Sequence, residues 1–197
     1  MLILASSSPR RSQILTELGI AFEVDPADID EALRPGEAAD HAAARLAEAK
    51  AAAVAARRPD RWILAADTLV LLDTTILGKP RDDAEAESML RRLAGRTHRV
   101  VTGVHLHRGE SPGGSAVSWS TVRFAPMTDQ EIAWYVGTGE PRDKAGAYGI
   151  QGLGARFIEG ISGSYTNVMG LPARDVYRLM REAESLRVPG SPAPSSP

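Results

Sequence analysis

Polar and cationic residues crowd the start of the first expected helix. Serines at positions 6–8 are followed by Pro9, Arg10 and Arg11. Ser8 suits an N-cap and Pro9 the first helical position. Because the helix dipole is already positive at this end, two arginines are unfavourable there unless an anion is also present. Backbone N–H groups, hydroxyls and guanidinium groups together indicate a phosphate site, although a capped helix with two solvated arginines fits this stretch equally well.

Two acidic residues are candidates for metal and proton chemistry. Asp67 follows the apolar run Trp62–Ala66, and ligand sites of α/β proteins gather at strand ends. A carboxylate there can hold a hard cation or accept a proton from water. Glu31 lies in an expected loop, and the two together would give the carboxylates that Mg²⁺ takes beside substrate phosphates. From position alone, an ordinary turn aspartate and a solvated glutamate remain open.

Lysine and glutamine are two further residue types that could contact a ligand. Only three of the 23 basic residues are lysines, at Lys50, Lys79 and Lys144. A compact ammonium can contact a phosphate oxygen as a point charge. Gln151 stands between glycines in the segment YGIQG, and its amide could pair with a base edge through one donor and one acceptor. The alternatives are that the choice of lysine at these positions reflects drift and that Gln151 is an ordinary surface glutamine.

Composition excludes several classes of function. The chain has 197 residues, 43% apolar residues, a net charge of −2 and no cysteine, so thiol nucleophiles, disulfides and thiolate metal sites are excluded. No segment is apolar enough to span a membrane, and the first apolar run is too short for a signal peptide, which is consistent with the cytosol. Balanced charge and 5% aromatic residues argue against a nucleic-acid partner. His105 and His107 alternate on one expected strand, but without a third ligand they favour exposed strand residues over a metal site.

Hydrophobic periodicity predicts an alternation of helices and strands. Helices are expected at about 9–18, 37–57, 83–94 and 128–137, and a last one opens at Pro172. Strands are expected at 2–5, 22–29, 62–66, 97–107 and 115–125, with Ser111–Gly114 as a hairpin turn between the last two. After residues 67 and 68 the chain is expected to continue extended at 69–72 and to turn at 73–75 into 76–77. The central antiparallel hairpin predicts a mixed sheet. Residues 188–197 are rich in proline and serine and are expected to form a disordered tail.

Several segments together resemble the Maf family of nucleoside triphosphate pyrophosphatases. They run from Leu2 to Pro172 and read LILASSSPRR, ARLAEAKA, ILAADTLV, LGKPRD, THRVVTGV and EPRDKAGAYGIQGLGARFIEGISGSYTNVMGLP. Each is weak alone, whereas the combination is highly specific. The chain is more similar to the branch acting on dTTP and UTP than to the 7-methyl-GTP branch, because it has Arg10, Thr68 and Gln151 at the distinguishing positions.

The resemblance implies a fold and an activity. The fold is α/β, an elongated mixed twisted sheet flanked by helices, with two lobes around a cleft as in inosine triphosphate pyrophosphatase. Residues 1–187 would form a single Maf-like domain. The activity would be hydrolysis of dTTP, UTP and modified pyrimidine nucleotides to the monophosphate and pyrophosphate, in the cytoplasm and with Mg²⁺ or Mn²⁺. No membrane or nucleic-acid partner is implied, and a homodimer is left open.

The resemblance also assigns roles to individual residues. Asp67 would be the proton acceptor that activates water, and Glu31 and Asp67 would hold the metal. The residues expected to grip the triphosphate are Ser6, Ser8, Arg10, Arg11, Lys50 and Lys79. Arg10, Thr68 and Gln151 would select the base. Two alternatives stay open: a non-catalytic regulator of septum formation that binds a protein partner, and a pyrophosphatase of the 7-methyl-GTP type.

Overall fold

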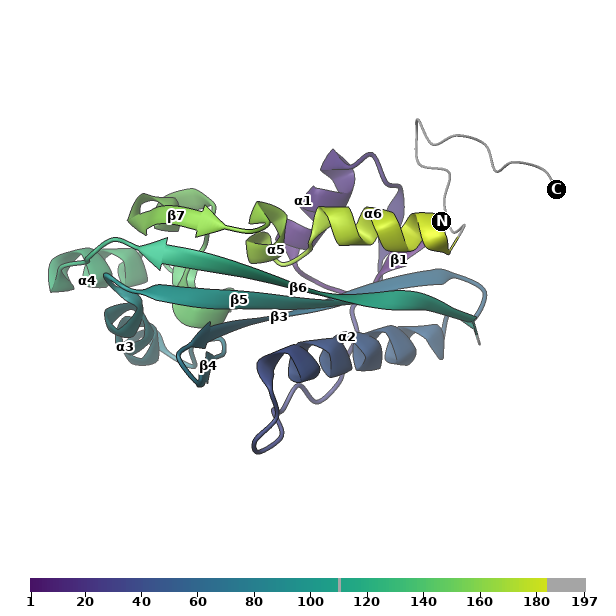
Figure 1. Ribbon diagram of the computed structural model, residues 1–197, viewed down its shortest axis with the longest axis horizontal. Coiled ribbons are helices and arrows are strands. Elements are labelled where there is room, and N and C mark those ends of the chain that lie inside the picture. Colours follow the sequence, from purple (N-terminus) through teal and green to yellow (C-terminus); the bar gives the residue numbers. More distant parts are fainter. Residues whose placement is uncertain (110, 184–197) are drawn as a thin grey trace.

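One twisted sheet runs through the residues that the computed structural model describes, which are 1–109 and 111–183. Its strands are β1 (Leu2–Leu4), β2 (Phe22–Val24), β3 (Trp62–Leu72), β4 (Thr75–Leu77), β5 (Thr97–Arg108), β6 (Ser111–Phe124) and β7 (Ile158–Ser162). The order is β2-β1-β3-β5-β6-β7, with β4 paired to β3. β1 is parallel to both neighbours and the other pairs are antiparallel. Figure 1 shows β3, β5 and β6 along the length of the molecule, which confirms an elongated mixed sheet.

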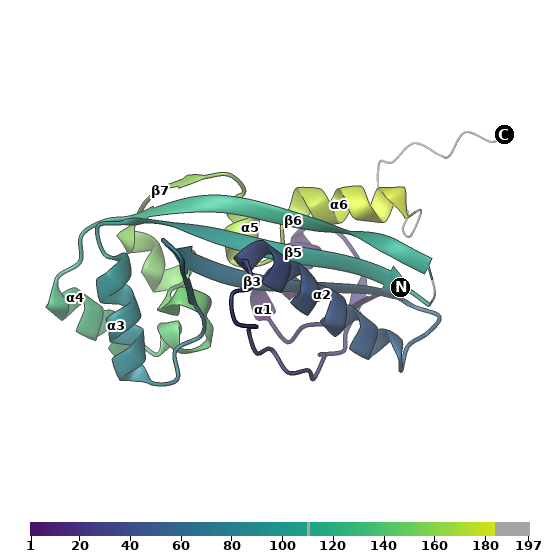
Figure 2. The same ribbon diagram turned by 60° about the horizontal axis from the view of Figure 1, so that its bottom comes forward.

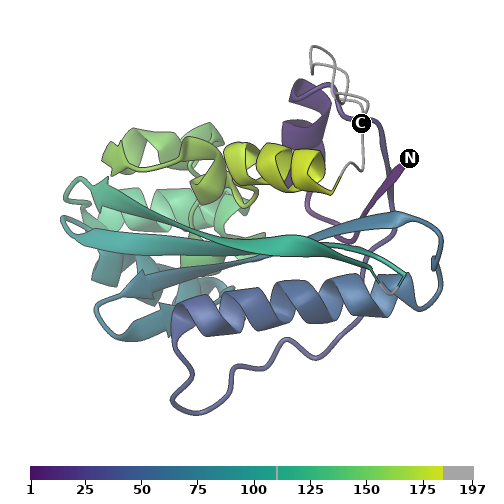
Figure 3. The same cartoon turned by 45° about the vertical axis from the view of Figure 1, so that its right-hand side comes forward.

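Helices cover both faces of this sheet. They are α1 (Pro9–Glu17), α2 (Ala39–Ala55), α3 (Asp83–Leu93), α4 (Asp129–Gly137), α5 (Tyr165–Met169) and α6 (Ala173–Glu182). Figure 3 shows α2 lying along one face, with α6 on the opposite face. Figure 2 places α3 and α4 together at one end of the sheet and α1, α2 and α6 toward the other. This arrangement confirms the predicted α/β class with helices on both sides.

Strand alternation divides the core between the two faces. Ile63 and Ala65 of β3 pack with α2 residues, whereas Leu64 and Ala66 pack with residues of α1, α5 and α6. Because successive strand side chains point to opposite faces, one buried strand supplies both layers. That residues 1–187 form a single domain stays a prediction, and the expected tail at 188–197 lies outside the described residues.

Two sequence predictions about strand ends are wrong. The expected strand at 62–66 and the extended segment at 69–72 are one strand, because antiparallel pairing with β5 extends from Ile63 to Leu71 and places Asp67 inside it. Residues 111–114 belong to β6 and are not the hairpin turn. The glycine at 113 serves close packing there, since a Cβ would approach the Trp62 ring to 2.6 Å. Regular structure in the predicted 22–29 segment is limited to β2, at the edge of the sheet.

Helix starts follow the predicted capping chemistry. Asp82 accepts a hydrogen bond from the Glu85 backbone, and Thr128 with Glu131 forms a complete capping box. Ser8 is the N-cap of α1 in backbone conformation, but its side chain makes no capping hydrogen bond. The hydroxyl is therefore not used to close the first turn of α1.

The sheet has an open edge in its middle. β1 pairs with β3 at residues 62–64 and β4 pairs with β3 at residues 70–72, while β5 occupies the opposite edge. Within the described chain, neither β1 nor β4 covers β3 between these two stretches. Asp67 and Thr68 lie in this interval and point to opposite faces. An open edge therefore lets side chains from both faces line one cavity.

Gly103 lets α2 approach the sheet opposite Asp67. The two residues are direct cross-strand partners, and a Cβ on Gly103 would lie 2.4 Å from the backbone oxygen of Ala43 in α2. We predict that Gly103→Ala forces α2 outward and destabilises the protein by about 2 kcal/mol. Urea denaturation measures this, with Gly160→Ala as control because a Cβ there meets nothing within 4 Å. Equal stability of the two variants would contradict this packing.

Candidate active site

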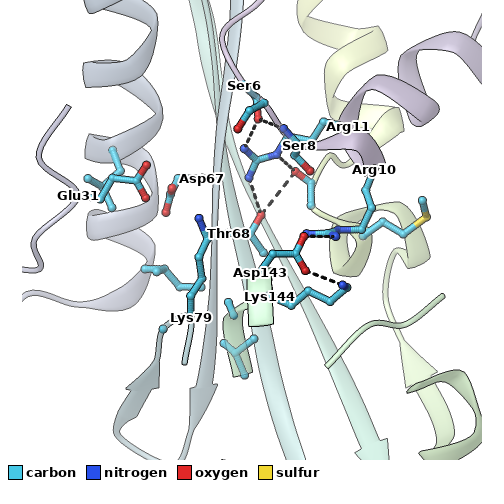
Figure 4. A pocket seen from close by; sticks show the side chains of 18 of the residues that line it. Ser6, Ser8, Arg10, Arg11, Glu31, Asp67, Thr68, Lys79, Asp143 and Lys144 are labelled. Carbon is cyan, nitrogen blue, oxygen red and sulfur yellow. Dashed lines mark hydrogen bonds and ion pairs between the residues drawn. The ribbon is translucent and has the colours of Figure 1, made fainter. Parts of the chain in front are cut away.

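A cleft of about 460 Å³ opens at the uncovered edge of β3. Its wall includes most residues that the sequence singled out, namely Ser6, Ser8, Arg10, Arg11, Glu31, Lys50, Asp67, Thr68 and Lys79. Figure 4 shows most of these side chains arranged around one space, although they come from α1, β3 and several loops. Gln151 is half-buried and is not part of the wall, while the preceding Gly149 and Ile150 are.

A buried ion-pair cluster occupies the α2 side of the cleft. Lys50 projects from α2, and its Nζ lies 2.6 Å from Oδ1 of Asp67 and 2.9 Å from Oε1 of Glu31. The Lys50 and Asp67 side chains are each 8% exposed, whereas Glu31 is 49% exposed. A buried charge needs a partner, so the single ammonium compensates Asp67 and also fixes where the Glu31 loop meets the sheet.

The charge state of Glu31 follows from this cluster. Partial burial alone would raise its pKa, but the hydrogen bond and charge of Lys50 reverse that effect. The nearby charges of Lys79 and Arg11 act in the same direction. The pKa of Glu31 therefore lies below its ordinary value, and the side chain is a carboxylate at neutral pH.

The two carboxylates form a donor set suited to a hard cation. Their oxygens converge on one ammonium nitrogen, so both can serve one point in the cleft. In the described part of the chain, no cluster of three or more His, Cys, Asp or Glu could hold a metal by itself. Mg²⁺ commonly takes one or two carboxylates and completes its shell with substrate phosphates and water. Glu31 and Asp67 fit that pattern.

Arg11 forms the opposite side of the cleft. Its Nε donates to the Gly170 carbonyl at 2.8 Å, one terminal nitrogen to Ser6 Oγ at 3.0 Å, and the other to Thr68 Oγ1 at 3.3 Å. Burial lowers the pKa of the guanidinium, and the charge of Asp67 opposes that shift. Since arginine ordinarily titrates far above neutrality, Arg11 remains a cation. It is thus a fixed positive charge with its hydrogen bonds directed by the protein.

The start of α1 adds donors beside Arg11. No acidic residue lies in the first turn of α1, and Ser8 makes no side-chain cap. Ser8 donates its backbone N–H to Ser6 Oγ at 3.2 Å, which shapes the serine turn. The first N–H groups of a helix together with its dipole attract anions. The start of α1 therefore lines the cleft with the donors that the sequence analysis expected, and anion binding there stays a prediction.

Two charged residues of the cleft wall, Asp143 and Lys144, were not predicted as part of the site. Asp143 accepts from Arg10 at 3.2 Å and from Lys144 Nζ at 2.7 Å, and both Asp143 and Lys144 line the wall. Lys144 also donates to the Glu140 carbonyl at 2.6 Å. Asp143 is 133 positions from Arg10 in sequence, and no local pattern reports such a contact. The scarcity of lysine was the available signal for Lys144.

Tyr148 provides an aromatic wall held from behind. Its hydroxyl lies 2.8 Å from Nε2 of His98, a residue only 2% exposed. Burial lowers the pKa of His98 to about 4, so the imidazole is neutral at pH 7. Edge-on ring contacts join both residues to Phe124. This aromatic part of the cleft wall is therefore uncharged and closely packed from behind.

The charge of the cleft differs in sign from that of the whole chain. Among the described residues, the wall holds five basic side chains and three carboxylates, whereas the full sequence has a net charge of −2. The basic residues are Arg10, Arg11, Lys50, Lys79 and Lys144. Clefts lined by one sign of charge concentrate ligands of the opposite sign. The wall has an excess of two positive charges, which favours an anionic ligand.

Comparison with known proteins places this chain in a family. The model of the family described as "Maf-like protein" matches residues 1–183. The chain belongs to this family. A Maf-like relative from Anaeromyxobacter sp. (strain Fw109-5), named dTTP/UTP pyrophosphatase, is 48% identical over 98% of this chain and 95% of the relative. A relative of the same name from Myxococcus xanthus (strain DK1622) is 49% identical over 93% of this chain and 92% of its own.

Solved structures give a partial match to this Maf-like chain. The Ham1 protein of Staphylococcus aureus aligns over 65% of this chain and 72% of its own, with 17% identity and a TM-score of 0.43. Over the described residues, no helix combines the length and apolar character needed to cross a bilayer.

Removing the buried ammonium should destabilise the fold. We predict that Lys50→Met lowers the free energy of unfolding by about 3 kcal/mol at neutral pH, because Asp67 is left buried without a partner. The Lys50→Met/Asp67→Asn double variant should recover part of that loss. Lys79→Met is the control, since Lys79 is exposed and its loss should change stability by less than about 0.5 kcal/mol.

The difference in unfolding free energy between wild type and Lys50→Met should change with pH in a defined direction. A carboxylate with a lowered folded pKa contributes stability above its unfolded pKa, about 4.3 for glutamate, and loses it as the pH falls through the folded value. Lys50 lowers the pKa of Glu31, so the stability gap between wild type and Lys50→Met should narrow below about pH 4. Urea midpoints across pH measure it, and a gap that widens in acid would contradict the cluster.

Proposed function

We propose that the protein is a nucleoside triphosphate pyrophosphatase that hydrolyses dTTP and UTP to the monophosphate and pyrophosphate. The observation that carries this proposal is the cationic cleft with Asp67 buried against Lys50 inside it. A triphosphate is the kind of anion that such a cleft attracts, and a fixed carboxylate beside it can accept a proton. The names of the Maf-like relatives support the substrate class.

The triphosphate would bind along the basic wall. Arg11 is already oriented by Ser6, Thr68 and the Gly170 carbonyl, so little side-chain entropy is lost when it meets a phosphate. Ser6, Ser8, Arg10, Lys50 and Lys79 complete the set proposed for phosphate contact. A guanidinium pairs with phosphate through parallel N–H bonds, while an ammonium acts as a point charge.

Asp67 is the residue proposed to activate water. The Lys50 hydrogen bond at 2.6 Å holds one carboxylate oxygen, which leaves the second oxygen to accept the proton of a water molecule. That water would attack the α-phosphorus, and pyrophosphate would leave. Burial strengthens electrostatic interactions. Protonation of the Asp67 carboxylate would therefore have a large effect on the charged groups around it.

Glu31 and Asp67 are proposed to hold Mg²⁺ or Mn²⁺ with the phosphates. When bound, such an ion offsets the negative charge that develops on the phosphate oxygens in the transition state. Glu31 belongs to a loop and is half exposed, so it can adjust its contact with Lys50 when a nucleotide enters. Asp67 lies on a rigid strand and keeps its place.

Base selection is proposed to rest on Arg10, Thr68 and Gln151. Thr68 is in the wall, Arg10 reaches the wall where it meets Asp143, and Gln151 follows the wall residue Ile150. Polar groups that the wrong base leaves unpaired can discriminate strongly. The proposed substrates extend to modified pyrimidine nucleotides, in the cytoplasmic nucleotide pool.

Asp67→Asn is expected to reduce hydrolysis of dTTP and UTP by about 10²–10⁴-fold, because the amide cannot accept the proton. Pyrophosphate release with excess Mg²⁺ measures the rate, and EDTA should abolish it in the wild type. Asp60→Asn changes an exposed aspartate outside the cleft and should keep full activity. A folded Asp67→Asn protein that works at the wild-type rate would refute the role of Asp67.

A nucleotide panel tests the proposed selectivity. We expect kcat/KM to be highest for dTTP and UTP. In Gln151→Ala and Arg10→Ala, the ratio of kcat/KM for dTTP over purine triphosphates should fall. A preference for 7-methyl-GTP would instead support the other Maf branch. Absence of turnover with every nucleotide would favour a non-catalytic, protein-binding role.

A further inference from the structure

The carboxylate of Asp143 bridges two basic residues in the wall of the cleft. Arg10 of α1 donates to one carboxylate oxygen at 3.2 Å, and Lys144 Nζ donates to the other at 2.7 Å. Asp143 ends the 3₁₀ helix η1 (Glu140–Asp143), so the bridge joins segments that lie far apart in the sequence. Figure 4 shows the three side chains at the cleft, with both contacts as dashed lines. Neither Asp143 nor Lys144 has a role in the proposed reaction.

The two cations are set into the wall, whereas the carboxylate between them is open to solvent. The side chains of Arg10 and Lys144 are 25% and 15% exposed, while that of Asp143 is 60% exposed. Exposed ion pairs add little to stability, because water screens the charges and both side chains lose freedom. A ligand that enters from solvent can therefore displace Asp143 more easily than it can displace the buried Asp67 from Lys50.

Lys144 is held in place by a second contact that does not involve Asp143. Its Nζ also donates to the Glu140 carbonyl at 2.6 Å. The Glu140 carboxylate in turn accepts the backbone N–H groups of Leu153 and Gly154, at 2.9 and 3.0 Å. An ammonium has three protons. Lys144 can therefore stay anchored on the carbonyl while it exchanges its hydrogen bond to Asp143 for one to a ligand.

The contact of Arg10 with Asp143 is weaker than the one that a phosphate could make. It is a single hydrogen bond of 3.2 Å, whereas charge-assisted N–H···O bonds commonly measure about 2.7–2.9 Å. A phosphate group can accept two parallel N–H bonds from one guanidinium, and its charge at neutral pH exceeds that of a carboxylate. A phosphate ligand therefore offers Arg10 a better partner than Asp143 does.

Asp143 offsets part of the positive charge of this wall. Partial burial alone would raise its pKa, but the hydrogen bond and charge of Lys144, and to a lesser extent Arg10, keep the pKa below its ordinary value. The side chain is therefore a carboxylate at neutral pH. Its two oxygens are acceptors of the kind that a phosphate group would offer to the same two cations.

We propose that Arg10 and Lys144 form an anion subsite for a phosphate group, and that Asp143 occupies this subsite until the ligand displaces it. The inference rests on the proposed function for the source of the phosphate, which is the triphosphate of the substrate or the pyrophosphate released from it. When the anion leaves, the carboxylate returns to the two cations. Asp143 thus lowers the affinity of the cleft for phosphate ligands.

Asp143→Asn tests the displacement, because it removes the competing charge at almost the same size. We expect the Kd of inorganic pyrophosphate, measured by titration calorimetry in EDTA, to fall about threefold to fivefold, the range of an exposed ion pair. Asp83→Asn is the matched control. Asp83 pairs with Arg142, the residue before Asp143, but lies outside the cleft wall. It loses the same charge and should keep the wild-type Kd.

The two cations can be tested by removing them. In an Arg10→Met/Lys144→Met background, adding Asp143→Asn should no longer tighten pyrophosphate binding, since nothing remains for the carboxylate to mask. A gain that persists there in a folded protein would overturn the inference. So would Asp143→Asn binding pyrophosphate no more tightly than wild type, or Asp83→Asn binding it as tightly as Asp143→Asn. The last two comparisons do not depend on how the triple variant folds.

Kinetics with dTTP distinguishes the two sources of the phosphate. If the substrate triphosphate uses the subsite, Asp143→Asn should lower KM for dTTP as well as the inhibition constant of pyrophosphate. If only the product uses it, the inhibition constant alone should fall. A wild type inactive on both dTTP and UTP would refute the proposed function, whereas the pyrophosphate titrations would still decide whether Asp143 masks an anion subsite.

Discussion

The ammonium of Lys50 is the contact on which the cleft depends. Its nitrogen forms ion pairs with buried Asp67 and with Glu31 of the neighbouring loop, at 2.6 and 2.9 Å. Without it, two carboxylates would converge in a poorly solvated space, which is unfavourable at neutral pH. The close approach of α2 to β5 at Gly103 brings Lys50 within reach. The packing of α2 against β5 therefore also determines where the Lys50 charge lies in the cleft.

The open edge of β3 joins two chemically different faces. Asp67 and Thr68 are neighbours in sequence and point to opposite sides of the sheet. On one side, Lys50 forms ion pairs with Asp67 and Glu31, the two residues proposed for metal binding. On the other, Arg11 donates a hydrogen bond to Thr68, whose hydroxyl also contacts that of Thr102. If another strand covered this whole edge of β3, the side chains of the two faces would lie in separate layers and would not line one cleft.

Much of this arrangement could be predicted from the sequence, but not its long-range contacts. The start of α1, the caps at Asp82 and Thr128, and the mixed sheet follow from local propensity and periodicity. The uninterrupted β3 could not be predicted, because pairing with β5 outweighs the turn preference of aspartate. The contact of Arg10 with Asp143 joins residues 133 positions apart in the chain, and no sequence spacing reports it.

Hydrolysis of dTTP in ¹⁸O-labelled water tests the central claim most directly. If water activated in this cleft attacks the α-phosphorus, mass spectrometry will find one ¹⁸O atom in dTMP and none in pyrophosphate. Both products should appear in equal amounts from the first turnover. Label in pyrophosphate, or release of dTDP with labelled orthophosphate, would mean that attack occurs at the β- or γ-phosphorus and would contradict the account.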